Sequence, residues 1–187
     1  MNKELIEEYL INPFTLMFRT IIKEEKRITE IIEFEEIYYT EESPLNIIKR
    51  NCGYYGSDYE GRRNGTKQLI AITHKAPILL ESHTPIYLFP TKSPQHEFCA
   101  WIAHDHVKAC RKADIKSLTI VKFRNNHEYT VSISTTPFRT QLSRTAMLRI
   151  EYEKSLERIE MYNLLKQSYF MKASEDRGPY RPSISAV

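Results

Sequence analysis

The 187-residue sequence lacks the features of secreted, disulfide-stabilised and membrane-spanning proteins. It has only three cysteines, Cys52, Cys99 and Cys110, and their odd number and wide spacing exclude a disulfide framework and favour a reducing compartment. No run of about 18 apolar residues occurs, so we expect no membrane-spanning helix. The N-terminus, MNKELIEEYL, lacks the basic and then apolar segments of a signal peptide. Together these absences predict a cytoplasmic protein with one main domain.

Common catalytic motifs are missing as well. Gly56 and Gly61 have the spacing of a nucleotide-binding phosphate loop, but two arginines follow where that loop requires Lys and then Ser or Thr. No G-x-S-x-G nucleophile motif is present. The acidic residues in the middle of the chain are scattered rather than paired for acid–base catalysis. We therefore predict that the protein is not an enzyme and binds no cofactor.

A metal site is the alternative hypothesis for the middle of the chain. Four potential ligands occur between residues 99 and 110, namely Cys99, His104, His106 and Cys110. If residues 98–107 form a strand, the two histidines face one side and Cys99 faces the other. The cysteine pair spaced by two to four residues that is typical of zinc sites is absent. We predict no metal, and a metal-dependent hydrolase stays open as an alternative.

The charge is distributed unevenly along the chain. The net charge is +3, but residues 1–43 carry −6, residues 44–150 carry +9 and residues 151–187 carry zero. A region this basic attracts polyanions, of which nucleic acid is the commonest. A protein-binding module whose basic face meets an acidic partner is the second hypothesis that this charge leaves open.

The pattern of residues predicts mostly strands. FTLMFRTII, ITEIIEF and EIYYT in residues 13–39 are strand-like, with KEEKR as a turn. Ser43 and Pro44 predict a helix over residues 44–52, and Gly53 predicts its left-handed end. QLIAIT, APILL, PIYLF and FCAWIAHDHV are again strand-like and are separated by prolines. SLTIVKF and EYTVSIS predict a hairpin around RNNH.

A long C-terminal helix completes the prediction. Thr136 and Pro137 are typical of a helix start, and the helix is expected to run from Phe138 to about Phe170. Its spacing of apolar residues predicts a buried stripe of Leu148, Tyr152, Leu156 and Ile159. Strands that follow one another without intervening helices predict an antiparallel-rich α+β domain with a short helix near residues 44–52 and a long C-terminal helix.

The segment CGYYGSDYEGRRNGTK at residues 52–67 holds four of the five glycines of the chain. Its Asn64-Gly65 pair is the strongest two-residue signal for a β-hairpin, so we expect Arg62 and Arg63 near an exposed turn. A protruding basic hairpin can enter a DNA groove, and arginine suits a narrow minor groove. The segment therefore predicts a DNA contact.

Several motifs between residues 43 and 149 are similar to those of a known family. The sequence resembles the ComK family of competence transcription factors in SPLNIIKRNCGYYGSDYEGRRNGT, ITHKAPILL, IYLFPTKSP, CAWIAHDHV and QLSRTAMLR. The resemblance implies a transcriptional activator of DNA-uptake genes, without a catalytic site or metal. It implies binding to paired AT-rich boxes, largely through the minor groove, as a dimer or higher oligomer. It also implies RNA polymerase and a proteolysis adaptor as partners, and a place in the cytoplasm at the nucleoid.

The resemblance and the charges together give the expected DNA contacts. These are Arg62 and Arg63 first, then Lys67, Lys75, Lys49 and Arg50, and less strongly Arg144 and Arg149. We expect the glycines to shape the loop, namely Gly53, Gly56, Gly61 and Gly65.

The expected division of the chain has four parts. These are an acidic strand segment at residues 1–42, a basic DNA-binding core at 43–150, the end of the C-terminal helix at 151–172 and a disordered tail at 173–187. SYFMKAS near the C-terminus is similar to the patch through which the family meets its adaptor, although packing of a helix end is the favoured interpretation.

Overall fold

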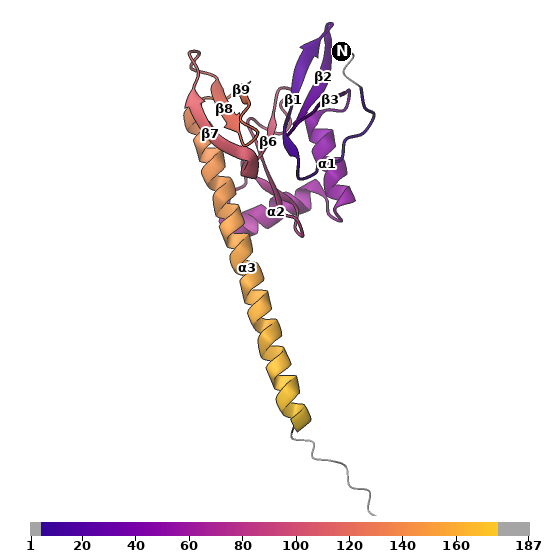
Figure 1. The fold of residues 1–187 in the computed structure, drawn as a ribbon, viewed down its shortest axis with the longest axis vertical. Helices are drawn as coiled ribbons and strands as arrows, with labels where there is room; N and C mark the ends of the chain where they lie inside the picture. The colour runs from indigo at the N-terminus through magenta and orange to yellow at the C-terminus, as the bar shows by residue number, and fades with distance from the viewer. Residues whose placement is uncertain (1–4, 176–187) are drawn as a thin grey trace, which may run out of the picture. The chain divides into compact units, whose positions relative to one another are not determined.

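The computed structural model describes residues 5–175, and the side chains of residues 5–169 (Figure 1). The chain divides into two compact units, residues 1–150 and residues 151–187. The elements in chain order are β1 (Thr15–Lys23), β2 (Lys26–Glu33), β3 (Ile37–Thr40), α1 (Pro44–Tyr54), α2 (Tyr59–Ile70), β4 (Ile78–Glu81), β5 (Ile86–Pro90), β6 (Trp101–Ala103), the 3₁₀ helix η1 (His104–His106), β7 (Val107–Lys112), β8 (Thr119–Phe123), β9 (Glu128–Val131) and α3 (Thr135–Glu175).

The main sheet has six antiparallel strands in the order β3-β2-β1-β6-β5-β4. Strand β1 pairs with β6 in the register Met17 to Ile102 and Phe18 to Trp101. The acidic N-terminal strands therefore belong to the same sheet as strands of the basic middle region. The expected charged turn joins β1 to β2, where Glu24 and Glu25 have φ of 50° and 63°.

A second sheet has the order β7-β8-β9. The hairpin expected around RNNH is present between β8 and β9, where the Phe123 N–H donates to the His127 carbonyl at 3.0 Å and Asn126 has φ 68°. The antiparallel sheets and the long final helix confirm the predicted α+β class.

The main sheet has apolar side chains on both faces. Neighbouring residues of a strand point to opposite sides, and neighbouring apolar residues of β1 and β6 lie in two different core clusters. Phe18 and Trp101 lie in a core cluster with Ile47, Ile48 and Cys52 of α1. Met17 and Ile102 lie in a second cluster, with Val121 and Phe123 of β8, Val131 of β9 and Phe138 of α3. Helix α1 therefore covers one face of the main sheet, and the second sheet with the start of α3 covers the other.

The predicted start of α1 is confirmed, and its predicted end is wrong. The Ser43 Oγ accepts from the Asn46 N–H at 3.3 Å, with Pro44 at the first helical position. Gly53, however, lies inside the helix, and the left-handed residue is Gly56, with φ 69°. The helix extends past Gly53 to Tyr54, and the Tyr55 N–H makes a further helical hydrogen bond to the Asn51 carbonyl at 3.0 Å.

The predicted long C-terminal helix is present, but it begins at Thr135, three residues before the expected Phe138, and its predicted buried stripe is wrong. Only Leu148 is buried, whereas Tyr152 is half-buried and Leu156 and Ile159 are 38% and 55% exposed. The first unit ends at residue 150, and the second consists of a single helix in its described part, so it has no second element to pack against. Backbone helix continues through residues 173–175 of the expected tail, and residues 176–187 lie outside the described residues, as do the side chains of residues 170–175 in SYFMKAS.

Candidate nucleic-acid interface

Helices α1 and α2 form a compact pair joined by residues 55–58. Gly56 takes the left-handed conformation in this turn, and the Asp58 Oδ1 then accepts from the Gly61 N–H at 2.7 Å. The turn thus ends one helix and caps the next within four residues. Two helices joined by a short turn that contains glycine have the connectivity of a helix–turn–helix unit.

The hairpin predicted at Asn64-Gly65 does not form. Both residues lie inside α2, and so do residues 68–70 of the expected strand QLIAIT. The cap at Asp58 fixes the helix start, and the buried Thr66 Oγ1 donates to the Pro77 carbonyl at 2.7 Å. The local cap at Asp58 and the tertiary hydrogen bond of Thr66 together outweigh the preference of Asn-Gly for a turn.

Arg62 and Arg63 consequently lie on a helix and are half-buried rather than exposed at a turn. The Arg62 Nη2 donates to the Tyr55 carbonyl at 3.1 Å, and its buried Nε has no partner among the described residues. Arg62 therefore braces the turn between α1 and α2. The Arg63 Nη1 lies 2.9 Å and 2.8 Å from the two carboxylate oxygens of Glu60, and its guanidinium lies 5.7 Å from the centre of the Tyr59 ring.

The lysines of the two helices are more accessible. Lys49 on α1 and Lys67 on α2 are exposed, and neither forms an ion pair within the described part of the chain. Lys75 is half-buried in the loop after α2, with φ 49°, and its carbonyl accepts from the Gln141 Nε2 at 2.9 Å. Side chains of the lysines on α1 and α2 are thus available to an anion.

Arg50 has a structural role, because it is bonded to residues outside α1. Its Nη2 lies 2.9 Å from the Glu42 Oε2 and donates to the Tyr9 carbonyl at 2.8 Å. The hydrogen bond to the Glu42 carboxylate raises the pKa of Arg50 above its ordinary value. The neighbouring buried Asn51 accepts from the Ile11 N–H at 2.8 Å. Both side chains fasten α1 to the N-terminal segment.

The two arginines predicted on the last helix are separated from each other. The Arg144 Nη1 donates to the His74 carbonyl at 3.4 Å, next to the loop after α2. The Arg149 Nη1 lies 3.0 Å from the Asp105 Oδ1, next to η1. Residues five apart on a helix point about 140° apart, which explains this division. The structure therefore does not bring all the predicted DNA-contacting residues into one patch.

Three further cations lie around Arg149, and the sequence-based list of contacts omits them. Lys108, Arg124 and Arg139 line a trough with Arg149, although they come from β7, the β8–β9 turn and α3. Arg139 and Arg149 are ten residues apart on α3, which rotates them by about 80° relative to each other around the helix, so their spacing alone does not predict a shared surface. The positions of Lys108 and Arg124 depend on strand pairing.

The glycines have different environments. The turn requires a glycine at residue 56, because its φ of 69° is in the left-handed region. A Cβ on Gly61 would lie 3.2 Å from the Ser57 Oγ. At Gly53 and Gly65 a Cβ would meet nothing within 4 Å, although a glycine inside a helix costs roughly 0.5–1 kcal/mol relative to alanine. No contact with a described residue explains these two glycines.

The geometry expected for the metal alternative is wrong. His104 and His106 lie in η1 rather than on one face of a strand, the first with its Nδ1 3.0 Å from Asp105 Oδ1 and the second with its Nε2 2.8 Å from the Pro13 carbonyl. Burial raises the pKa of the Cys99 thiol to about 11, which keeps it protonated at neutral pH. Among residues 5–169, no cluster of three or more metal-binding side chains occurs.

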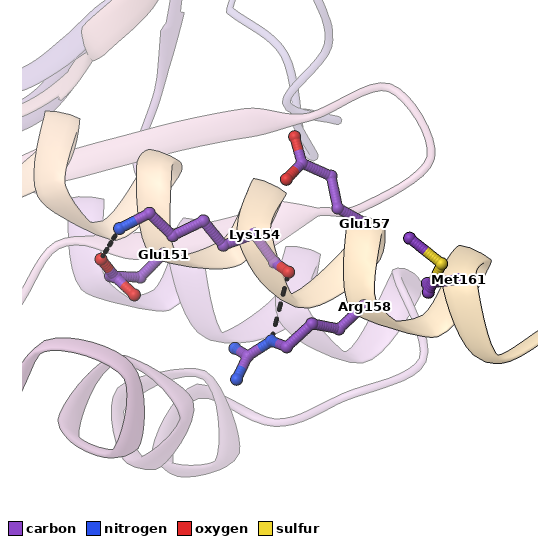
Figure 2. A pocket seen from close by; sticks show the side chains of 5 residues that line it. All are labelled: Glu151, Lys154, Glu157, Arg158 and Met161. Carbon is purple, nitrogen blue, oxygen red and sulfur yellow. Dashed lines mark hydrogen bonds and ion pairs between the residues drawn. The ribbon is translucent and has the colours of Figure 1, made fainter.

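A hollow in the second unit is lined by α3 alone (Figure 2). The Lys154 Nζ lies 2.7 Å from the Glu151 Oε1, and the Arg158 Nε donates to the Lys154 carbonyl at 3.3 Å. Glu157 and Met161 complete its lining. Acidic and basic side chains alternate here, so this surface does not add to the positive charge of the first unit.

Comparison with known proteins agrees with the family resemblance of the sequence. The ComK protein family matches residues 6–157. The chain is 34% identical over 175 residues to a protein named competence transcription factor from Bacillus subtilis (strain 168). The aligned residues cover 92% of this chain and 88% of that protein. No solved structure matches. The match of the family to most of the chain confirms the resemblance, and the chain therefore belongs to the ComK family.

Proposed function

We propose that this protein is a competence transcription regulator that binds duplex DNA. Its relative is named as a competence transcription factor, and membership of a transcription-factor family agrees with the prediction that the chain is not an enzyme. The observation that carries the proposal is the charge of residues 44–150, which is +9, although residues 1–43 of the same folded unit carry −6 and reduce the net charge of the unit to +3. DNA attracts such a surface over long range.

The pair α1 and α2 is the proposed recognition surface. Lys49 and Lys67 offer exposed charges, and Arg63 can exchange its Glu60 partner for a phosphate. The side-chain-free surface at Gly65 and Gly53 leaves room for a close approach of the DNA backbone. The proposed contacts of this surface are Arg62, Arg63, Lys67, Lys75, Lys49 and Arg50. Weaker proposed contacts are Arg144, beside the loop after α2, and Arg149, which lies apart from this surface next to η1. In the proposed complex the DNA offers paired AT-rich boxes, whose narrow minor groove attracts arginine.

The proposal includes an oligomer, because each of the two DNA boxes would be bound by one copy of the protein. The second unit supports this, since its helix exposes Leu156, Ile159, Met161, Tyr162, Leu164, Leu165 and Tyr169. Exposed apolar surface of this kind is typical of protein–protein contacts. RNA polymerase and a proteolysis adaptor are further proposed partners, and the proposed location is the cytoplasm at the nucleoid. Within the described residues no helix is long and apolar enough to cross a bilayer.

A binding assay with two duplexes tests the proposed function. Fluorescence anisotropy would compare a duplex that carries two AT-rich boxes with a GC-rich duplex of equal length, over a series of salt concentrations. We expect tighter binding to the AT-rich duplex, and affinity that falls steeply with salt because bound cations are released from DNA. Equal affinity for both duplexes would contradict sequence recognition, and binding to neither would favour a protein partner for the basic surface.

A further inference from the structure

A basic trough of about 510 Å³ lies between η1, β7 and the first turns of α3. Figure 1 shows β7 running beside the start of α3. All lining residues belong to the first unit. The cationic side chains of the trough are Lys108, Arg124, Arg139 and Arg149.

The charge of the trough is only partly neutralised. Asp105 is the one carboxylate among its described lining residues, and it already lies 3.0 Å from Arg149. The Arg124 Nε donates to the backbone carbonyl of Asp105, and the Lys108 Nζ donates to the neutral Asn126 side chain at 2.9 Å. Arg139 is exposed and forms no ion pair with any described residue. An anion that enters the trough therefore meets an excess of positive charge.

The shape of the trough suits an extended anion. Arg139 and Arg149 both line the trough and are ten residues apart on α3, which corresponds to about 15 Å along the axis and a rotation of about 80° around it. Ser143 and Ala146 lie between them and line the trough with small side chains. A small anion would occupy one end of this surface, whereas a DNA strand presents phosphates along the whole length.

The trough and the α1–α2 surface are separate. Helix α1 packs against the face of the main sheet that contains Phe18 and Trp101, and β8 with the start of α3 packs against the face that contains Met17 and Ile102. A duplex bound at α1 and α2 therefore does not account for the cations of the trough.

We propose that this trough is a second DNA-binding surface, which contacts the phosphate backbone and does not read the sequence. The inference rests on the proposed function, because it assigns a further contact with the same ligand. Phosphate contacts position a protein on DNA and supply affinity, but they do not distinguish one base sequence from another. The trough therefore contributes to affinity for every duplex.

The test replaces two cations of the trough that have no carboxylate partner. Lys108→Gln/Arg139→Gln is compared with Lys26→Gln/Lys116→Gln, which removes the same charge from two exposed lysines outside the trough. Anisotropy with the AT-rich and GC-rich duplexes gives affinity against salt. We expect the log–log salt slope of the trough variant to fall in magnitude by about two, one for each phosphate contact, with an unchanged ratio between the duplexes. The control should keep the wild-type slope.

Cys110 supplies a second measurement on the unchanged protein. It is half-buried and lines the trough. Saturating AT-rich duplex should slow its alkylation by iodoacetamide several-fold, as measured by mass spectrometry. Circular dichroism would establish that both variants are folded.

The outcomes separate the two proposals. If the wild type prefers the AT-rich duplex while the trough variant matches the control and Cys110 is unprotected, this inference alone is wrong. A variant that loses the preference between duplexes would show that the trough reads sequence, which also contradicts the inference. A variant that binds DNA normally but no longer activates transcription would assign the trough to a protein partner. Wild-type protein that binds neither duplex would overturn both proposals.

Discussion

The Arg63 guanidinium lies 2.8 Å from the Glu60 carboxylate, one turn away on α2. The Glu60 side chain is exposed, whereas the Arg63 side chain is half-buried and lies beside the Tyr59 ring. An ion pair of this kind contributes little to stability, at most about 1 kcal/mol. In a complex with DNA, however, the Glu60 carboxylate would compete with phosphate for Arg63 and would repel the duplex.

Replacing Glu60 by glutamine should therefore strengthen DNA binding. We expect Glu60→Gln to raise the affinity for an AT-rich duplex several-fold at low salt, while it lowers the free energy of unfolding by roughly 0.3–1 kcal/mol through loss of a negative charge in the first turn of α2. Anisotropy and urea denaturation measure the two effects. Glu128→Gln, which removes a carboxylate from the Arg111 ion pair on the second sheet, is a matched control for net charge. An affinity equal to that of the wild type would place Arg63 away from the DNA.

Gly65 allows stability and binding to be separated. Its φ is not positive and a Cβ would meet nothing within 4 Å, so Gly65→Ala should raise the free energy of unfolding by roughly 0.5–1 kcal/mol. The same methyl group should weaken DNA binding if the backbone of the duplex approaches this surface. Denaturation and anisotropy on one preparation test both effects. A more stable variant with wild-type affinity would show that Gly65 lies outside the interface.

Asp105 should make the stability of the first unit depend on pH. The hydrogen bond from His104 and the charge of Arg149 lower the pKa of Asp105 below its ordinary value, against the opposite effect of burial. Because the folded-state pKa is the lower one, Asp105 stabilises the fold above the unfolded pKa of about 4, and this contribution disappears as pH falls through the folded value. Asp105→Asn should therefore lose less stability than the wild type between neutral pH and about pH 3. Parallel pH profiles of the two proteins in urea denaturation would contradict this role.

The three thiols should react at different rates. Burial raises the pKa of both Cys52 and Cys99 to about 11, whereas Cys110 is half-buried. Thiolate is the reactive form, so iodoacetamide at pH 8 should modify Cys110 first and leave the other two intact until denaturant is added. Peptide mass spectrometry over time measures this order. Equal rates for the three residues in the folded protein would contradict the described core.

The first unit should remain stable without the second. All members of the two core clusters lie before residue 150, and Leu148 is the last buried apolar side chain in the described part of the chain. A chain that ends at Ile150 should keep its free energy of unfolding to within roughly 1 kcal/mol, whereas Leu148→Ala should cost roughly 2–4 kcal/mol. A large loss of stability on truncation would show that residues 151–175 contribute to the core.

The sequence predicted the elements that depend on local signals. Ser43 and Pro44 began α1 as expected, the turn at Glu24 and Glu25 joined two strands, and the hairpin at residues 124–127 formed. Each of these rests on a cap or on a turn geometry within a few residues. The same type of signal failed at Asn64-Gly65, because the cap of Asp58 and the Thr66 bond to the Pro77 carbonyl stabilise a helix there.

The candidate site was harder to predict than the fold. The basic region between residues 44 and 150 was evident from the sequence, but the partners of its side chains were not. Arg50 is held by Glu42, and Arg63 by Glu60, through contacts that only the folded chain brings together or orients. The trough required the pairing of β7 with β8 and the packing of α3, which bring Lys108 and Arg124 near Arg149. Spacing along the chain contains no signal for such an arrangement.

The most direct test of DNA recognition by α1 and α2 is the affinity of Arg62→Ala/Arg63→Ala for the two duplexes. Circular dichroism and urea denaturation would first establish that the variant is folded, because Arg62 also bonds the Tyr55 carbonyl. We predict a loss of roughly 1–3 kcal/mol per arginine on the AT-rich duplex and a smaller loss on the GC-rich one, so that the preference between them diminishes. A folded variant that keeps the wild-type preference and affinity would contradict the account.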